Sequence, residues 1–313
     1  MPDMTAQPDP QVVNIHGPII SSSDLDRHLA LFQALGMEEV GRISRSADET
    51  TALWGTTGQA LREITLETPG FPFGVRLLRF DPGSDVQIRQ PSRGSDCDAL
   101  KVIDFYAPDL DVARDRIEAA GFRFKSEVAE YDTAEGRFRE MHLWGPDGVV
   151  CALISGDPAF YESFATVRDR IVSEPQSISG PVQDHGATLQ FFETVFGLKV
   201  IHRYGLDDDS FRDLVGTDNA IKLRAWNVGI TTTEPYFGII DYGMVAGSQT
   251  SLIDIAAPPA RGLLGATLRV RDAKVIADRA GTQPVSTYVP GFGDVLVATC
   301  PAPNGGWYQA VQI

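Results

Sequence analysis

The stretch VVNIHGPIISSSDLDRHLALF, residues 12–32, decides how this sequence folds. It begins with a short apolar segment, passes through Gly-Pro, reaches a polar cap and then places apolar residues at helical spacing. Ser23 or Asp24 can cap the helix, and Gly36 suits the left-handed conformation that often ends one. The stretch therefore predicts a strand followed by an amphipathic helix.

The same pattern returns in the second half of the chain, in QSISGPVQDHGATLQFFETVFG at residues 176–197. There Asp184 can cap the helix and Gly197 can end it. Further segments match in outline between the two halves, and they are 62–83 with 221–243, 101–121 with 265–281, and 143–155 with 300–313. Each half thus predicts two units of strand, helix and further strands, which indicates an internal duplication.

The spacing of the repeats predicts a division of the 313 residues into two similar domains. Residues 1–10 are rich in Pro and Asp and are expected to form a flexible tail. Residues 11–156 are the expected first domain and 176–313 the expected second domain. Residues 157–175 match neither half and are expected to form a linker helix or strap.

The composition is that of a globular protein with an acidic surface. Hydrophobic residues make up 43% and charged residues 22%, and the net charge is −15 with a pI near 4.7. Such a surface repels nucleic-acid phosphates and anionic membranes, so neither is an expected partner. No apolar run reaches the roughly 20 residues that cross a bilayer, the N-terminus lacks a signal-peptide pattern, and Cys97, Cys151 and Cys300 form no CxxC. A cytoplasmic protein with reduced thiols is expected.

The order of these units resembles the vicinal oxygen chelate superfamily, which includes glyoxalase I, extradiol dioxygenases, fosfomycin-resistance proteins, methylmalonyl-CoA epimerases and bleomycin-binding proteins. The most specific pieces are Asp24-Leu25 opening a helix that ends in Leu-Gly-Met, the heptapeptide FFETVFG at 191–197, and Gly-Pro-Asp-Gly at 145–148. The resemblance covers nearly the whole chain. It implies an α+β fold in which four βαβββ units form two glyoxalase-like domains with cup-shaped mixed sheets.

In chelating members of that superfamily, His or Glu at four inward positions of a cup binds a divalent metal, and this sequence departs from that pattern. The matching positions in the first half are His16 or Gly17, Leu77, Val102 or Ile103, and Ala152. Those in the second half are Ser177 to Ser179, Ile240 or Asp241, Gly265 or Ala266, and Gln309. A metal normally needs three protein ligands, so neither a family-type metal centre nor another cofactor is expected. A divalent metal on displaced ligands remains the alternative, with His16, His142 and Asp241 as its ligands.

Three residues are candidates for acid or base chemistry. His142 precedes the Gly-Pro-Asp-Gly turn, where ring-cleaving relatives carry a cleft-facing Tyr, and an imidazole titrates near neutral pH. His16 interrupts an apolar strand, where a polar ring needs a partner, and the resemblance places it in the cup of the first domain. Asp104 lies in the apolar strand KVIDFYA, where a buried carboxylate is paired or has a shifted pKa. Each also fits a structural role, as a hydrogen-bonded or outward-facing strand residue.

Arg79, Trp144, Phe73 and Arg139 are the candidate substrate-binding residues. Arg76 and Arg79 are three residues apart on one strand, so they face opposite sides and at most one enters the cup. A guanidinium there could hold a carboxylate or phenolate. Trp144 and Phe73 could line an apolar pocket, and Arg139 is a further cation of the first domain. The alternatives are solvated positions for the arginines and core positions for the aromatic residues.

These observations predict an enzyme that acts on a small apolar or aromatic oxygenated molecule by metal-independent acid/base chemistry, as a lyase, isomerase or epimerase. The first domain is the expected site. Two alternatives remain open: a metal-dependent enzyme of glyoxalase or extradiol dioxygenase type with displaced ligands, and a non-catalytic protein that binds a drug or metabolite. The expected partner is a small-molecule substrate, and a homodimer is compatible with the resemblance.

Overall fold

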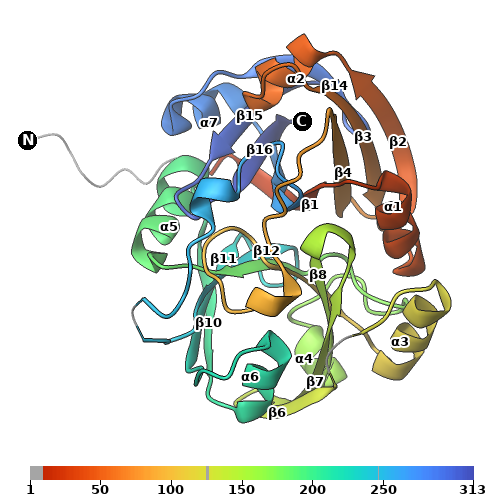
Figure 1. The fold of residues 1–313 in the computed structure, drawn as a ribbon, viewed down its shortest axis with the longest axis vertical. Coiled ribbons are helices and arrows are strands. Elements are labelled where there is room, and N and C mark those ends of the chain that lie inside the picture. The colour runs from red at the N-terminus through yellow and green to blue at the C-terminus, as the bar shows by residue number, and fades with distance from the viewer. Residues whose placement is uncertain (1–9, 125–126, 246) are drawn as a thin grey trace, which may run out of the picture.

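The computed structural model describes residues 10–124, 127–245 and 247–313 (Figure 1). Apart from residue 10, the expected N-terminal tail lies outside these residues. The strands are β1 Val12–Ser21, β2 Glu38–Arg45, β3 Ala60–Glu67, β4 Gly74–Asp81, β5 Val102–Tyr106, β6 Ala129–Thr133, β7 Gly136–Trp144, β8 Val150–Ser155, β9 Ser177–Pro181, β10 Lys199–Leu206, β11 Leu223–Gly229, β12 Tyr236–Asp241, β13 Gly262–Val270, β14 Val285–Val289, β15 Gly293–Pro301 and β16 Trp307–Gln312. The α-helices are α1 Leu25–Ala34, α2 Ala47–Trp54, α3 Leu110–Ala119, α4 Pro158–Tyr161, α5 His185–Phe191, α6 Asp209–Val215 and α7 Ala273–Ala280. Within the described ranges, no helix is long and apolar enough to cross a membrane.

Four βαβββ units follow one another along the chain, which confirms the predicted fold class. The first unit runs from β1 to β4 and contains α1, and the second runs from β5 to β8 and contains α3. The third runs from β9 to β12 with α5, and the fourth from β13 to β16 with α7. Units one and three each have one additional helix between their second and third strands, α2 and α6 respectively.

The helix of each unit begins at an aspartate, as the repeats predict. Asp24, Asp109, Asp184 and Asp272 each accept a hydrogen bond from a backbone N–H two or three residues further on. These bonds satisfy donors that the first turn of a helix otherwise leaves unpaired. Gly197 follows the helical segment of unit three with φ 72°, in the left-handed conformation that glycine adopts readily.

The four units pair into two eight-stranded sheets. The terminal sheet combines units one and four in the order β14-β15-β16-β13-β1-β4-β3-β2, and the central sheet combines units two and three in the order β10-β11-β12-β9-β5-β8-β7-β6. Figure 1 shows the terminal sheet in red, orange and blue above the central sheet in yellow, green and cyan. Each sheet therefore draws one unit from each half of the chain, so neither sheet coincides with residues 11–156 or 176–313.

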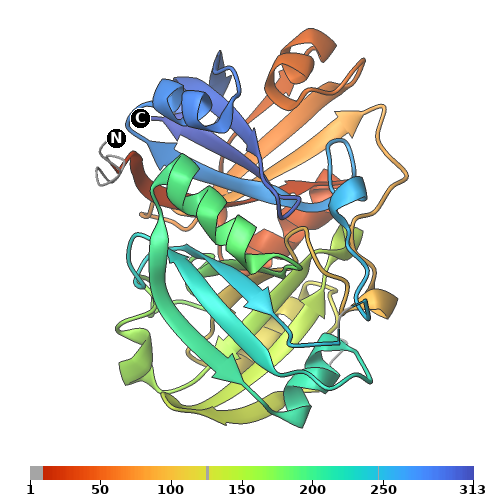
Figure 2. The same ribbon diagram turned by 90° about the vertical axis from the view of Figure 1, so that its left-hand side faces the viewer.

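The main hydrophobic core lies between the two sheets, where the helices pack. Figure 2 shows α5 in this layer. The ring of Tyr308, on β16 of the terminal sheet, lies 5.2 Å from the ring of Phe192, which follows α5, and 5.2 Å from that of Phe237 on β12 of the central sheet. This aromatic packing joins the sheets through their helix-bearing faces, and the opposite face of each curled sheet points away from the core.

The segment 157–175, which we call the strap, connects units two and three across the central sheet. It is helical only in α4, so the expected linker helix is limited to four residues. Further along, the carboxylate of Glu174 accepts hydrogen bonds from the backbone N–H groups of Thr166 at 2.8 Å and Val167 at 2.9 Å. These bonds hold the strap in an irregular turn.

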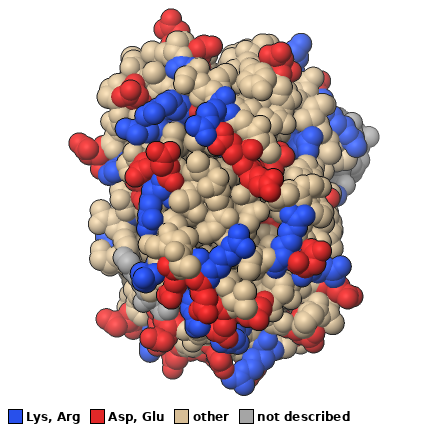
Figure 3. All heavy atoms as spheres, turned by 90° about the vertical axis from the view of Figure 1, so that its right-hand side faces the viewer, with Lys and Arg blue, Asp and Glu red and all other residues tan. Residues whose placement is uncertain are grey.

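Charged side chains are distributed over the surface. On the face shown in Figure 3, acidic and basic residues are interspersed and form no continuous basic patch. The net charge of −15 is therefore not the result of one acidic cluster on this face.

Candidate functional site

The face of the terminal sheet opposite α1 and α7 is filled by protein. Helix α2 packs there and buries Leu53 and Trp54, whose exposed fractions are 4% and 2%. The ring of Trp54 meets that of Phe80 edge to face at 6.3 Å, and Thr299 on β15 donates a hydrogen bond to the carbonyl of Leu53. This helix leaves the terminal sheet without an open cup.

A buried ion network occupies the rest of the same face. Glu63 on β3 accepts hydrogen bonds from Arg76 at 2.8 Å and from Arg45 at 3.1 Å. Arg76 also donates to Gln309 at 2.7 Å and to Thr267 at 3.0 Å. All hydrogen-bonding partners of Arg76 here are protein groups, so this arginine stabilises the fold and leaves no cation for a ligand.

His16 lies in the terminal sheet and is fully buried. Its Nδ1 is 3.0 Å from the carbonyl oxygen of Pro72, and its ring packs edge-on against Phe292 at 4.9 Å. Burial lowers the pKa of His16 to about 3, so the ring is neutral at physiological pH. The expectation that His16 and His142 share one cup does not hold, because β1 belongs to the terminal sheet and β7 to the central sheet.

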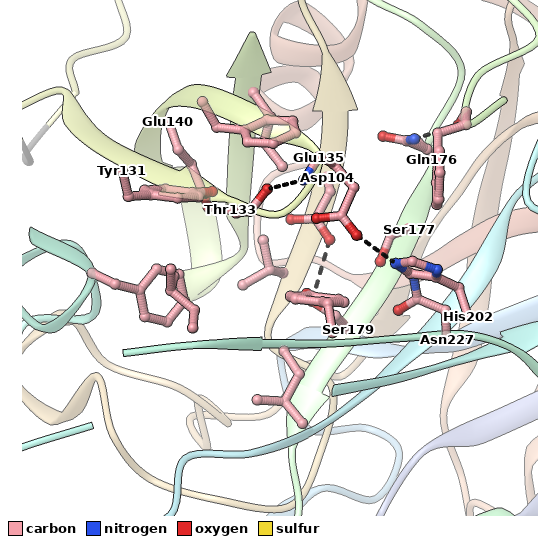
Figure 4. A pocket seen from close by; sticks show the side chains of 18 of the residues that line it. Asp104, Tyr131, Thr133, Glu135, Glu140, Gln176, Ser177, Ser179, His202 and Asn227 are labelled. Atoms are coloured by element: carbon pink, nitrogen blue, oxygen red, sulfur yellow. Dashed lines mark hydrogen bonds and ion pairs between the residues drawn. The ribbon is translucent and has the colours of Figure 1, made fainter. Parts of the chain in front are cut away.

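The concave face of the central sheet forms an open cavity of about 980 Å³, counting the solvent at its mouth (Figure 4). Strands of units two and three form its floor, and the strap, α6 and the β6–β7 hairpin supply parts of its walls. The aromatic side chains in the lining are Tyr131, Phe138, Phe160, Tyr161, Phe164, Tyr204, Phe211, Tyr236 and Tyr242. Its aromatic lining is typical of a site for a small organic molecule.

Asp104 and His142 stand on either side of Ala152 in this floor. Asp104 on β5 and His142 on β7 both pair with Ala152 on β8, which lies between them. Residues paired across neighbouring strands share a face of the sheet, and two strand spacings place the Cα atoms of Asp104 and His142 about 10 Å apart. Ala152, between them, carries only a methyl group and is itself fully buried.

The floor next to Asp104 is also built from small residues. Asp104 pairs with Ser177 on β9, and Ser179 is followed in the next strand by Gly238. A Cβ atom at Gly238 would come within 2.7 Å of the Cβ of Ser179, so glycine keeps this part of the floor open. Small side chains in the floor and aromatic ones in the walls together give the cavity its depth.

The carboxyl group of Asp104 is held at the edge of ionisation at neutral pH. Its Oδ2 accepts a hydrogen bond from Ser179 at 3.3 Å (Figure 4). Burial, and next the nearby charge of Glu140, raise the pKa of Asp104 to about 7 against the opposing effect of hydrogen bonds from Ser177 and Ser179. Asp104 can therefore accept or donate a proton near pH 7.

Glu140 connects His142 to Tyr131. The Nε2 atom of His142 is 2.9 Å from Oε1 of Glu140, and the hydroxyl of Tyr131 donates to Oε2 at 2.5 Å. An ionised carboxylate only accepts hydrogen bonds, so Nε2 of His142 is the donor to it. Glu140 was not among the residues predicted from the sequence, although its spacing of two residues from His142 on a strand places both on one face.

At the mouth of the cavity, units two and three contact each other. His202 on β10 lies 4.0 Å from the carboxylate of Glu135 in the β6–β7 hairpin, and its ring packs against Phe164 of the strap at 5.1 Å. Figure 4 shows Glu135 and His202 joined by a dashed line. Among the described residues that line the cavity, none is Lys or Arg.

The predicted substrate-binding residues lie outside this cavity. Arg79 is on β4 of the terminal sheet and lines two other surface pockets, and Phe73 is buried just before the same strand. Arg139 faces away from the cavity and forms ion pairs with Asp111 at 3.4 Å and Glu130 at 3.6 Å. Arg139 faces away because side chains alternate between the two faces of a strand, and Arg139 is three residues from His142 on β7.

Among the predicted substrate-binding residues, Trp144 lies closest to the cavity of the central sheet. It is partly buried at the end of β7 and packs on the cluster of Val102, Val150 and Ala152, on the same face of the sheet as the cavity. It therefore borders the floor and is not among the residues that line the cavity. Among the catalytic candidates, the structure thus brings Asp104 and His142 together and separates His16 from both.

The side chains present do not fit a divalent metal at the family's positions. In the central sheet those positions hold residues such as Val102, Ala152, Ser179 and Ile240, which are weak ligands or none. Within the described ranges, no group of three or more His, Cys, Asp or Glu side chains is placed to hold a metal ion. The displaced set is also dispersed: His16 is in the other sheet, and Asp241 pairs with Arg224 at 2.5 Å.

No family model and no curated protein matches this sequence. Solved structures do match its fold. A point mutant of glyoxalase I from Zea mays has a TM-score of 0.63 at 14% identity, covering 96% of this chain and 92% of that one. Unmutated glyoxalase I from Zea mays has a TM-score of 0.57 at 14% identity, with the same coverage. A putative dioxygenase from Bacillus subtilis subsp. subtilis str. 168 has a TM-score of 0.50 at 11% identity, covering 97% and 86%. The chain therefore has a tandem glyoxalase-like fold, as seen in glyoxalase I.

Proposed function

We propose that this chain, which has the fold of glyoxalase I, is an enzyme that moves a proton at a carbon beside a carbonyl group. Its substrate is a small, largely apolar or aromatic molecule held in the cavity of the central sheet. One observation carries the proposal: Asp104 and His142 flank Ala152 on the floor of an aromatic-walled cavity. This arrangement supports a mechanism in which both groups transfer protons to or from the same bound molecule.

Asp104 is the proposed base. Its carboxylate takes a proton from the carbon, the electron pair of the C–H bond moves toward the carbonyl carbon, and the carbonyl oxygen gains negative charge. Return of the proton to the opposite face gives an epimer, and return to a neighbouring carbon gives an isomer. Loss of a leaving group from the next carbon, with its electron pair, gives a lyase product. A base with a pKa near the working pH is the most efficient choice for such a step.

His142 and Glu140 are the proposed second group. The carboxylate of Glu140 accepts a hydrogen bond from Nε2 of His142 and so orients the imidazole from a neighbouring position on β7. Glu140 stabilises the imidazolium that forms when the ring takes up a proton. His142 can then supply a proton to the developing oxygen anion or to the carbon on the far side of Asp104.

The proposal is tested by solvent exchange, which detects proton removal whatever product forms. A panel of aromatic and aliphatic ketones and aldehydes is incubated with the protein in D₂O, and deuterium uptake beside the carbonyl is followed by proton NMR. We expect exchange with some members of the panel, and a loss of about 10²-fold or more in Asp104→Asn and in His142→Ala. Asp132→Asn, an exposed carboxyl group on neighbouring β6, serves as the matched control and should exchange at the wild-type rate.

The aromatic lining also favours a second candidate, a protein that sequesters a small molecule without changing it. The same panel distinguishes the two functions. Sequestration would be supported if a panel member binds but shows neither deuterium exchange nor product, and if Asp104→Asn leaves that molecule equally unchanged. Exchange that depends on Asp104 would support the enzyme.

A further inference from the structure

We infer that the ligand of the central cavity is an aromatic molecule that carries a positively charged nitrogen. The inference rests on the site of the proposed function and adds the class of substrate to it. It is drawn from the charges of the cavity lining, from its aromatic surfaces and from the hydrogen bonds of two buried basic residues near it.

Carboxyl groups outnumber basic groups in the lining. Asp104, Glu135 and Glu140 face the cavity, against His142 and His202. With all three carboxyl groups ionised, which for Asp104 requires a pH above about 7, the lining is negative. Since the described part of the lining contains no Lys or Arg, an anionic ligand would enter this cavity without a permanent cation to pair with.

The aromatic walls suit a cation as well as an apolar ring. Aromatic rings attract a cation at their faces, with Trp and Tyr stronger than Phe. Tyr204 and Tyr236 come from two strands of unit three, whereas Phe160 and Phe164 come from the strap. The rings of Phe160 and Phe164 are stacked at 4.2 Å and so form one continuous apolar surface. A ligand can therefore place its ring against the strap and its nitrogen over the tyrosines and Asp104.

Two buried basic residues, Lys101 and Arg89, lie near the cavity and are not among the residues that line it. Lys101, at the start of β5, is 1% exposed and donates to the carbonyl of Gly94 at 2.6 Å and to the hydroxyl of Tyr242 at 3.1 Å. Arg89 is buried and donates to backbone carbonyls, including that of Leu100 at 2.9 Å. Burial also lowers the pKa of Lys101 to about 7, which reduces its charge near neutral pH. These two residues therefore contribute little compensation for the carboxyl groups.

A cationic nitrogen also fits the proposed chemistry. Removing a proton from carbon creates negative charge, and the cavity offers neutral donors such as the hydroxyls of Ser177 and Ser179 and the amide of Asn227. A positive charge within the substrate, close to the reacting carbon, stabilises that charge directly. The substrate would thus supply the electrostatic stabilisation that the lining lacks.

The test measures binding of matched compounds by calorimetry at pH 8, where Asp104 is ionised. Benzylamine, benzyl alcohol and benzoate have similar size and differ in charge, and the naphthylmethyl and biphenylmethyl equivalents extend the series. We expect each amine to bind about tenfold or more tightly than its alcohol, and the carboxylates not to bind in the millimolar range. In Asp104→Asn the preference for the amine should fall to about twofold or less, whereas Asp132→Asn should keep it.

Two results would overturn the inference: a carboxylate that binds as tightly as its amine, or no binding by any amine of the series. An amine preference that survives Asp104→Asn would also contradict it. Glu135 faces His202 and Glu140 is bonded to His142 and Tyr131, so the charge at Asp104 is the expected main source of the preference. The outcome is independent of turnover. Deuterium exchange without an amine preference would support the proposed function and reject the inference of a cationic ligand. An amine preference without exchange would support the cationic ligand and reject the proposed function.

Discussion

Asp104 shows how a single residue acquires its chemistry from its surroundings. The sequence KVIDFYA predicts a carboxyl group in an apolar strand, and the structure adds Glu140 on β7 and the two serines of β9 around it. Several phenols also face this region, among them Tyr204 and Tyr236. Burial against these groups opposes a negative charge, and the serine hydroxyls stabilise it only in part.

Replacing Asp104 by Asn should stabilise the protein in a pH-dependent way. The pKa of Asp104 is raised to about 7 in the folded state, against about 3.9 for an unfolded aspartate. The folded state therefore binds the proton more tightly, and wild-type stability falls as pH rises from about 4 to about 7. We expect Asp104→Asn to gain about 1 to 3 kcal/mol at pH 8 and little at pH 4, as measured by urea denaturation. An equal effect at both pH values would show that Asp104 is not held protonated by burial.

Tyr131 should contribute to stability through Glu140. The hydroxyl of Tyr131 donates a 2.5 Å hydrogen bond to a carboxylate that is 5% exposed. Hydrogen bonds to buried charged groups are stronger than neutral ones, so Tyr131→Phe should lose about 1 to 3 kcal/mol of unfolding free energy. Thermal and urea denaturation measure this loss. No change in stability would mean that water replaces the hydroxyl at Glu140.

At the scale of elements, α2 and α6 explain why the two sheets differ. Both follow the second strand of their unit, and each ends at a glycine in the left-handed conformation, Gly55 and Gly216. Helix α2 fills the terminal sheet with Trp54, whereas α6 contacts β6 and places Phe211 at the wall of an open cavity. The same position in two repeats thus closes one cup and lines the other.

Removing the side chain that fills the terminal sheet should affect stability and not ligand binding. Trp54→Ala is expected to cost about 3 to 5 kcal/mol, because a fully buried indole leaves a cavity that cannot collapse. Under conditions where the variant remains folded, its affinity for ligands of the central cavity should equal that of the wild type. Denaturation and calorimetry measure the two quantities. A loss of ligand affinity without a loss of stability would place the binding site in the terminal sheet.

The sequence predicts elements well and their partners poorly. Strands, helices and the capping residues Asp24, Asp109, Asp184 and Asp272 follow from local patterns, because capping and alternation act over a few residues. The sequence does not predict which units pair into one sheet. The four units are similar and their sheet edges are similar too, so the connections between them decide the pairing. His16 was assigned to the wrong cup for this reason.

At the scale of the whole molecule, each sheet needs both halves of the chain. Residues 11–156 alone contain one unit of each sheet, so β1 and β5 would lose their antiparallel partners β13 and β9. The fragment is therefore expected to show no cooperative unfolding transition as a monomer, and mixing it with residues 157–313 should restore one. Calorimetry with light scattering measures both. A stable, cooperative monomer of residues 11–156 would contradict the sheet pairing.

The most direct test of the central claim, that Asp104 is a base in the cavity of the central sheet, is the pH dependence of deuterium exchange. The base works as a carboxylate, so the rate in the wild type should rise with pH, reach half its maximum near pH 7 and then level off. The profile is repeated in Asp104→Asn, which should lack the rise and retain about 1% of the rate or less. A profile that levels off near pH 4, or an Asp104→Asn variant that exchanges at the wild-type rate, would contradict the account.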